Sequence, residues 1–291
     1  MIDFEYHSPV SLEETFDLLD RYGDDARVMA GGTALVLQMK HRFSQPGHVI
    51  SLRRVPGLDS ITTEPGGGPV SMRVGALCTQ RRIETNPIIA ETLPLVAETF
   101  SRVATPRIRN MGTIGGGLVH GDPNQDPPPT LIALGASVTM TSASGERVLS
   151  VEDLFIDYYE TDVQPGEVLA SVSIPPAPPG SGSCYIKFLP RTADDYATVS
   201  VAALVDPSED NVCRNVRIVL GSVGVTPVRA VDAESVLRGQ ELTGANIRAC
   251  AEAVREAVNP LEDFRGSSEY KTDMAEVFTR RAIEQALAKA G

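Results

Sequence analysis

The stretch TIGGGLVHGDPNQD, residues 113–126, contains four glycines, one histidine and two aspartates, and three prolines follow it directly. Glycine has no side chain, so a run of glycines lets another group approach the backbone closely. Thr113 can add a hydroxyl to a string of amides, and such a string can form a concave anion site. The stretch therefore predicts a phosphate-binding loop, and the alternative is a Gly/Pro-rich surface connection. The amides in question belong to Gly112, Gly115, Gly116 and Gly117.

A second glycine pair lies nearer the N-terminus. Residues 27–30 are typical of a short strand and TALVLQMKHR (33–42) of a helix, so Gly31 and Gly32 lie at a strand-to-helix turn. The unpaired N–H groups at a helix N-terminus suit a diphosphate. A Gly-Gly pair alone is also typical of an ordinary tight turn. Together the two segments predict contacts on both sides of an extended dinucleotide, with Asp122 or Asp126 offered to ribose or ribitol hydroxyls.

Charge and missing motifs exclude several functions. The 291 residues include 26 Lys and Arg against 38 Asp and Glu, a net charge of −12, and so acidic a chain repels nucleic acid. No GxGxxG follows a predicted strand and no GK dipeptide is present, which excludes the Rossmann and P-loop signatures. The signatures HExxH and GxSxG are also missing.

The N-terminus MIDFEYHSPV lacks the basic region of a signal peptide, and no apolar run reaches the ~18 residues of a membrane span. These features predict a cytoplasmic protein with no membrane span. The four cysteines form no CxxC pair, so no zinc or iron–sulfur site is expected from them. His120, Asp122 and Asp126 lack further metal ligands, and we expect no metal. We expect surface or packing roles for His7, His41 and His48.

The hydrophobic pattern divides the chain in two. Ser11 and Glu14 form a capping box for a helix that runs to Tyr22, and HVISLRRV (48–55) completes a βαβ-like unit. A helix or helix pair interrupted near Pro94 and a helix-to-strand segment at 130–142 follow. The stiff connector PPAPPG places a domain boundary near residue 178. Beyond it, three apolar runs, 184–190, 199–206 and 215–223, predict a small antiparallel sheet. Two segments with apolar residues at helical spacing, 243–258 and 267–290, predict helices.

Four blocks carry a family resemblance. In order and spacing they resemble the FAD-binding medium subunit of molybdenum hydroxylases, a family that includes bacterial carbon monoxide dehydrogenases and the flavin portion of xanthine dehydrogenases. The resemblance runs through nearly the whole chain. The blocks are AGGTALVLQMK (30–40), RNMGTIGGGLVHGDPNQD (109–126), KFLPRTADDYATVSVAA (187–203) and GSSEYKTDMAEVFTRRAI (266–283).

The resemblance implies an α+β fold. Residues 1–178 would form a FAD-binding domain of the vanillyl-alcohol-oxidase (PCMH) type, with subdomains at about 1–55 and 56–178 holding FAD between them. Residues 179–291 would form the C-terminal domain, a three-stranded antiparallel sheet with a helix bundle.

The resemblance also implies site residues. Two segments would clasp the FAD diphosphate, and Asp126 would bind cofactor hydroxyls. Asp122 and Asp126 keep the family's spacing after His120, and His120 and Asp122 are also expected to bind the cofactor. Lys187, Asp195 and Tyr196 would lie towards the isoalloxazine ring, where Lys187 would stabilise reduced flavin and Tyr196 would stack on it. A solvated lysine and a core tyrosine are the alternatives. The clasping residues are Ala30, Gly31, Gly32, Thr33 and Ala34, with Thr113, Ile114, Gly115, Gly116 and Gly117.

Two positions depart from the family. Ser or Asp is common where Ala34 stands, and Asn where Gly117 stands. Each change removes a side-chain hydrogen bond worth about 0.5–1.5 kcal/mol. FAD would then be held more loosely, or by backbone and water.

By the same resemblance, a large partner subunit hydroxylates the substrate at molybdenum, and a small subunit with two [2Fe–2S] clusters passes the electrons to this FAD and on to an external acceptor. The chain has no cluster cysteines, so we expect an electron-transfer subunit. A stand-alone flavoenzyme that oxidises a small metabolite is a second hypothesis, and a nucleotide-binding module without redox chemistry is a third.

Overall fold

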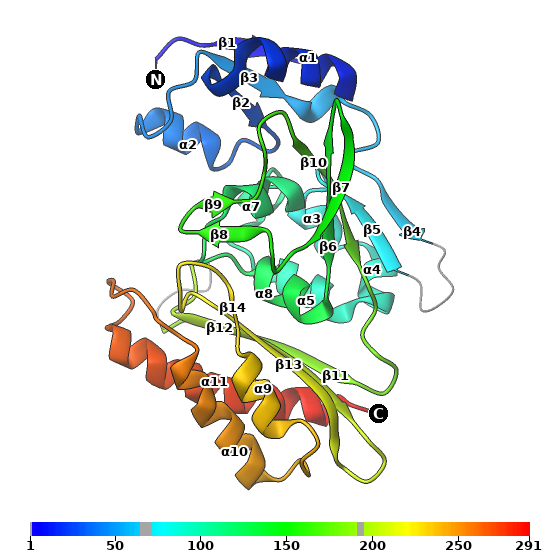
Figure 1. Ribbon diagram of the computed structural model, residues 1–291, viewed down its shortest axis with the longest axis vertical. Helices are drawn as coiled ribbons and strands as arrows, with labels where there is room; N and C mark the ends of the chain where they lie inside the picture. Colours follow the sequence, from blue (N-terminus) through cyan, green and yellow to red (C-terminus); the bar gives the residue numbers. More distant parts are fainter. Residues whose placement is uncertain (1, 65–70, 191–194) are drawn as a thin grey trace.

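The computed structural model describes residues 2–64, 71–190 and 195–291, and the chain forms three successive units (Figure 1). The N-terminal unit is a three-stranded parallel sheet in the order β1-β3-β2, with two helices. Its elements are β1 (Glu5–His7), α1 (Leu12–Tyr22), β2 (Ala26–Met29), α2 (Leu35–Lys40) and β3 (His48–Ser51).

The predicted βαβ unit is confirmed as β2-α2-β3, and helix α1 has the predicted ends. The Ser11 hydroxyl accepts from the Glu14 amide at 3.1 Å, and the Glu14 carboxylate accepts from the amide of Val10. Strand β1 was not predicted, because three residues are too few for a period-two pattern. The strand predicted over 48–55 is too long: it ends at Ser51, and residues 52–54 turn into a 3₁₀ helix.

The middle unit contains a five-stranded antiparallel sheet in the order β4-β5-β10-β6-β7 and a two-stranded hairpin, β8-β9. The strands are β4 (Ile61–Glu64), β5 (Ser71–Gly75), β6 (Ser137–Ser142), β7 (Gly145–Ser150), β8 (Phe155–Asp157), β9 (Glu160–Thr161) and β10 (Val168–Ile174). The helices are α3 (Gln80–Glu84), α4 (Pro87–Thr92), α5 (Pro94–Ser101), α6 (Pro106–Arg109), α7 (Ile114–His120) and α8 (Pro127–Leu134).

The helix pair predicted around Pro94 is confirmed as α4 and α5. Proline occupies the first position of each helix, where its missing N–H removes no helical hydrogen bond. The segment 130–142 does pass from a helix, α8, to a strand, β6.

The C-terminal unit is an antiparallel sheet in the order β11-β12-β13-β14 with a layer of three helices on one side, two of which contact the sheet directly. The three predicted apolar runs are the first three strands. Strand β14 and helix α9 were not predicted, because both are short. The elements are β11 (Gly182–Phe188), β12 (Val199–Pro207), β13 (Cys213–Gly221), β14 (Val228–Arg229), α9 (Val231–Leu237), α10 (Gly244–Ala253) and α11 (Ser268–Ala288).

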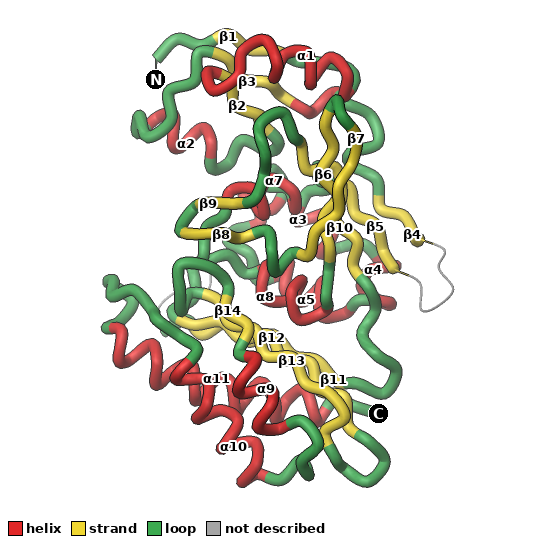
Figure 2. Tube along the Cα trace, in the orientation of Figure 1, coloured by secondary structure: helices red, strands yellow, loops and turns green. Residues whose placement is uncertain are grey.

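Helix α8 joins the middle and C-terminal units. All eight of its residues are buried, and it packs against β12 and β13 while α11 covers the same sheet from the other side (Figure 2). Tyr185, Ala202 and Val219 of that sheet belong to the hydrophobic core of the middle unit. One face of the C-terminal sheet therefore completes the core of the middle unit, while the other face packs a separate core with the C-terminal helices. In the part of the chain that the structure describes, no helix is both long and apolar enough to cross a membrane.

Candidate functional site

The two glycine segments, 30–34 and 113–117, lie against each other. A Cβ added to Gly31 would overlap the carbonyl oxygen of Met111, and one added to Gly116 would lie 3.2 Å from the Ala30 Cβ. Segment 30–34 connects β2 to α2, and segment 113–117 begins α7 in the middle unit. The contact therefore joins the N-terminal unit to the middle unit.

Segment 30–34 leaves its amides unused. Among residues 2–64, 71–190 and 195–291, none accepts a hydrogen bond from the N–H groups of Gly31, Gly32, Thr33 or Ala34. Ala34 precedes α2 without a side-chain cap, and Gly32 has the left-handed φ of +72° that glycine tolerates. A row of free N–H groups beside a helix start is suited to an anion.

Segment 113–117 differs from the prediction. It opens a helix, α7, and is not a loop. Thr113 caps the helix by accepting from the Gly116 amide at 3.1 Å, and the Gly117 amide donates to the Thr113 carbonyl. The amides of Ile114 and Gly115 donate to the carbonyls of Cys78 and Ala76. The expected open string of amides is therefore wrong for this segment.

Packing explains the glycines of α7. A Cβ on Gly115 would lie 2.5 Å from the Ala76 Cβ, so only glycine lets the helix approach the chain after β5 this closely. At Gly117, a Cβ would lie 2.9 Å from the Gln125 Oε1. The Gln125 amide also donates to the Gly117 carbonyl at 2.8 Å. Gln125 thus fills the space that a side chain at position 117 would take, a role that the sequence did not indicate.

His120 is the last residue of α7 and Asp122 follows the helix; both contact the β8-β9 hairpin. The His120 ring lies 5.1 Å from the Tyr159 ring, and burial lowers the pKa of His120. Asp122 is buried and accepts from the Asn124 amide at 2.9 Å, which forms a local turn. Burial, and then the nearby Asp122 carboxylate, raise the pKa of Tyr159 and of Tyr196. Asp122 therefore lies between the hairpin and the C-terminal unit.

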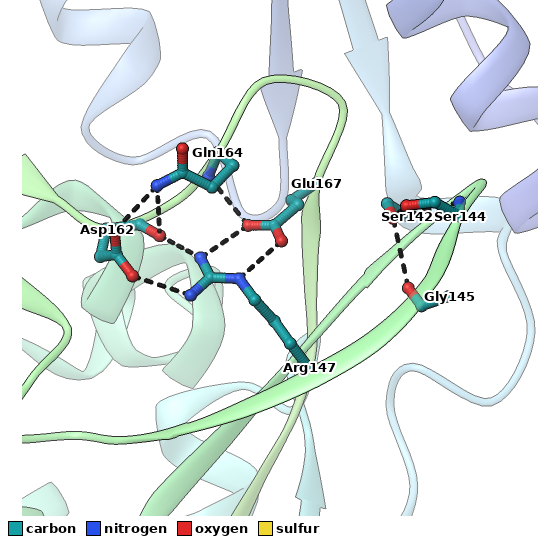
Figure 3. Close-up of polar contacts among 7 residues, drawn as sticks. All are labelled: Ser142, Ser144, Gly145, Arg147, Asp162, Gln164 and Glu167. Atoms are coloured by element: carbon teal, nitrogen blue, oxygen red, sulfur yellow. Dashed lines mark hydrogen bonds and ion pairs between the residues drawn. The ribbon is translucent and has the colours of Figure 1, made fainter.

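An arginine holds the segment after this hairpin. Figure 3 shows Arg147 of β7 between two carboxylates: it donates to Asp162 at 2.7 Å and to both oxygens of Glu167 at 2.7 and 2.8 Å. Gln164 joins the same network through Asp162 and Glu167. The hydrogen bonds from Arg147 hold the pKa of Glu167 below its usual value. This network fixes the chain between β9 and β10.

Asp126 and Lys187 form a buried ion pair. The Lys187 Nζ lies 2.9 Å from the Asp126 Oδ2, and their side chains are 3% and 4% exposed. The Tyr185 hydroxyl donates to the other Asp126 oxygen at 2.6 Å, and Lys187 also donates to the carbonyl of Arg102. Burial raises the pKa of Asp126, and Lys187 opposes that shift. The structure brings these two predicted site residues together at the joint between the middle and C-terminal units.

Asp195 and Tyr196 line a small pocket of the C-terminal unit with Arg265. Tyr196 is 41% exposed, and the Arg265 guanidinium lies 5.6 Å from its ring and 3.0 Å from the Asp195 carboxylate. Within the described residues, Thr198 Oγ1 and Arg265 Nε are buried without a hydrogen-bond partner. Arg265 was not predicted, although it directly precedes the fourth block. Residues 191–194 of the third block lie outside the described residues.

Comparisons with known proteins cover the whole chain. The family described as "FAD binding domain in molybdopterin dehydrogenase" matches residues 2–177, and "CO dehydrogenase flavoprotein C-terminal domain" matches residues 184–286. The carbon monoxide dehydrogenase medium chain of Afipia carboxidovorans is 38% identical over 99% of this chain and 98% of its own. The nicotine 6-hydroxylase medium subunit of Paenarthrobacter nicotinovorans is 36% identical over 98% and 97%.

The fold comparison agrees. A chain of carbon monoxide dehydrogenase from Hydrogenophaga pseudoflava matches with a TM-score of 0.94 and 36% identity, covering 100% of both chains. The α+β fold with a PCMH-type FAD-binding domain, predicted from the four blocks, is confirmed. The protein belongs to the FAD-binding medium subunits of molybdenum hydroxylases, a family of oxidoreductase subunits.

Proposed function

We propose that this chain is the electron-transfer subunit of a molybdenum hydroxylase complex. It takes electrons from the [2Fe–2S] clusters of a small partner subunit, after a large molybdenum subunit has oxidised the substrate, and passes them to an external acceptor. The match of full length to medium subunits supports this. All four cysteines are buried and free, which fits a chain that carries no cluster and works in the reducing cytoplasm. In this proposal residues 1–178 bind FAD and residues 179–291 form the C-terminal domain.

The relatives' names support a role that is independent of substrate. One medium subunit is named for a carbon monoxide dehydrogenase and another for a nicotine 6-hydroxylase, yet both align with this chain from end to end. Two such different substrates share no feature that one conserved pocket could select. We therefore assign substrate choice to the large subunit.

The free amides of segment 30–34 are the main support for FAD binding. Gly31, Gly32, Thr33 and Ala34 donate to the FAD diphosphate, because their N–H groups lack acceptors among the described residues and lie at a helix start. Segment 113–117 packs against segment 30–34, and its residues Thr113 to Gly117 contribute to FAD binding mainly by holding segment 30–34 in place. The flavin of FAD accepts electrons singly and releases them in pairs, which is the chemistry that a relay between clusters and an acceptor requires.

The remaining site residues fall into two groups. Exposed Tyr196 offers its ring to the flavin, and Asp195 positions Arg265 beside that ring. Asp122 is placed to meet cofactor hydroxyls, next to His120 and Tyr159. Lys187 and Asp126 are paired and buried, so we assign them a positioning role: they fix α8 to β11 and so set the distance between Tyr196 and the glycine segments.

Two measurements test this function. First, the chain purified from its native source should bring two other subunits, with molybdenum and iron in the preparation. Second, the isolated chain loaded with FAD should keep its oxidised flavin spectrum when organic substrates are added without oxygen, and should lose it when a chemical reductant is added. Direct bleaching of the isolated chain by a small metabolite would support a stand-alone flavoenzyme instead. A colourless protein that rejects FAD would contradict both.

A further inference from the structure

Three side chains with metal-binding atoms converge on one face of the N-terminal sheet. Glu5 and His7 are two residues apart on β1, so their side chains point to the same face of the sheet. Strand β3 pairs with β1 in parallel, with His48 opposite Glu5. The sequence positions 5, 7 and 48 gave no sign of this cluster, because it forms only through the pairing of β1 with β3.

The spacing of the three atoms fits one small ion. The His7 Nε2 lies 3.0 Å from the His48 Nδ1, and a Glu5 carboxylate oxygen lies 3.5 Å from the same nitrogen. All three atoms lie within 4.8 Å of one another. Neighbouring ligands around a tetrahedral zinc ion, with bonds of about 2.0–2.1 Å, are separated by roughly 3.3 Å. Two of the three separations, 3.0 and 3.5 Å, are therefore already close to those of a ligand set.

The three side chains can each offer a lone pair to one ion. The His48 Nδ1 faces two acceptor-capable atoms, the His7 Nε2 and the Glu5 carboxylate. A divalent cation accepts all three lone pairs at once.

The surroundings hold His48 in this orientation. The Tyr22 ring stacks on it with centroids 3.6 Å apart. The Asp25 carboxylate lies 3.9 Å from the other imidazole nitrogen, Nε2, and is itself fixed by the Gly47 amide at 2.8 Å. The 3.9 Å separation is longer than a hydrogen bond, and a small side-chain rotation would bring Asp25 to the position from which a carboxylate orients a histidine ligand in zinc sites.

We propose that Glu5, His7 and His48 bind a zinc ion, with water as the fourth ligand, and that Asp25 orients His48. Two imidazoles and one carboxylate form a recognised zinc donor set. The ion ties the edge strand β1 to the central strand β3. In the parallel register, His48 is opposite Ala26 at the start of β2, whereas segment 30–34 follows its end. The zinc site and the FAD segments thus lie at opposite ends of the small sheet.

The test is a calorimetric titration of the FAD-loaded, chelator-treated full chain with Zn²⁺. Wild type should bind one equivalent that His7→Gln and His48→Gln no longer bind, while FAD content stays unchanged. His41→Gln is the matched control, since His41 is exposed outside the cluster, and should bind like wild type. Asp25→Asn should weaken binding by about 10–100-fold, because it removes only the orienting carboxylate.

A second readout protects the test against unfolding of His48→Gln. Co²⁺ in place of Zn²⁺ should give a visible absorption band for a site of low coordination number in wild type and in His41→Gln, and none in His7→Gln. Wild type that binds no Zn²⁺ would overturn the proposal. So would a His7→Gln protein, folded by circular dichroism, that still binds one equivalent with wild-type affinity.

Discussion

The two glycine segments look alike in sequence and differ in structure. Segment 30–34 leaves four consecutive amides without an acceptor among the described residues. In segment 113–117, the amides of Ile114 to Gly117 all have partners within the protein. Glycine thus lies beside free amides in one segment and permits close helix packing in the other.

The difference extends beyond the amides. Downstream of α7, Asp122 closes a local turn and Asp126 pairs with Lys187 and Tyr185. The stretch 113–126 therefore satisfies most of its polar groups internally, whereas segment 30–34 does not. This difference is the reason for our proposal that the first segment binds the diphosphate and that the second mainly supports the first.

The largest effect is expected on stability, when Asp126 loses its buried ion-pair partner Lys187. Lys187→Met leaves the Asp126 carboxylate buried and unpaired, which costs about 3–5 kcal/mol in the free energy of unfolding. Urea unfolding measures it. The control is Arg214→Met, which breaks an ion pair with Asp206 whose arginine is 55% exposed and should cost about 1 kcal/mol or less. Equal losses in the two variants would contradict the internal role of Asp126.

The next effect concerns FAD affinity. Gly31→Ala forces a Cβ into the Met111 carbonyl and moves segment 30–34, so FAD affinity should fall by about 100-fold or more, equivalent to about 2.7 kcal/mol. Flavin fluorescence titration of the apoprotein measures it. Gly244→Ala is the control, because its Cβ meets only the Arg248 side chain at 3.5 Å. If Gly31→Ala binds FAD like the control, the first segment is not the diphosphate site.

A smaller effect is expected from the helix cap of the second segment. Thr113→Ala removes the acceptor for the Gly116 amide, which costs about 1 kcal/mol of stability. FAD affinity should fall far less than in Gly31→Ala. Thr243→Ala removes the equivalent cap of α10 in the C-terminal unit and should cost a similar amount. A loss of FAD affinity in Thr113→Ala as large as in Gly31→Ala would mean that the two segments bind FAD alike.

The smallest effect is a pH dependence from His120. Burial lowers its folded-state pKa below the usual 6.5, so the unfolded chain takes up a proton first as the pH falls. Wild type should therefore lose stability as the pH drops below about 6.5, and His120→Gln should lose less over the same range. Thermal unfolding at a series of pH values compares them. Parallel curves for the two proteins would show that His120 is not shielded by the β8-β9 hairpin.

Local signals predicted much of the fold. The capping box at Ser11, the prolines of α4 and α5 and the apolar runs of β11 to β13 each act within a few residues, so the sequence displays them. Strand β14 and helix α9 were missed because they are short and are stabilised by packing against β13.

The site was predictable in its residues and less so in its contacts. Glycine patterns indicated both segments, but a glycine beside free amides and one that packs against Ala76 cannot be told apart along the chain. The pairing of Asp126 with Lys187 joins residues far apart in sequence, and Arg265 reaches Tyr196 in the same way. Such contacts depend on tertiary packing and carry no local signal.

Amide hydrogen exchange with and without FAD shows which of the two glycine segments binds the diphosphate. The amides of Gly31 to Ala34 should exchange rapidly in the apoprotein and slow markedly when FAD binds, because binding gives them acceptors. Those of Ile114 to Gly117 should be slow in both states, because their acceptors belong to the protein. Protection that FAD induces at 114–117 and not at 31–34 would show that the second segment, and not the first, binds the diphosphate.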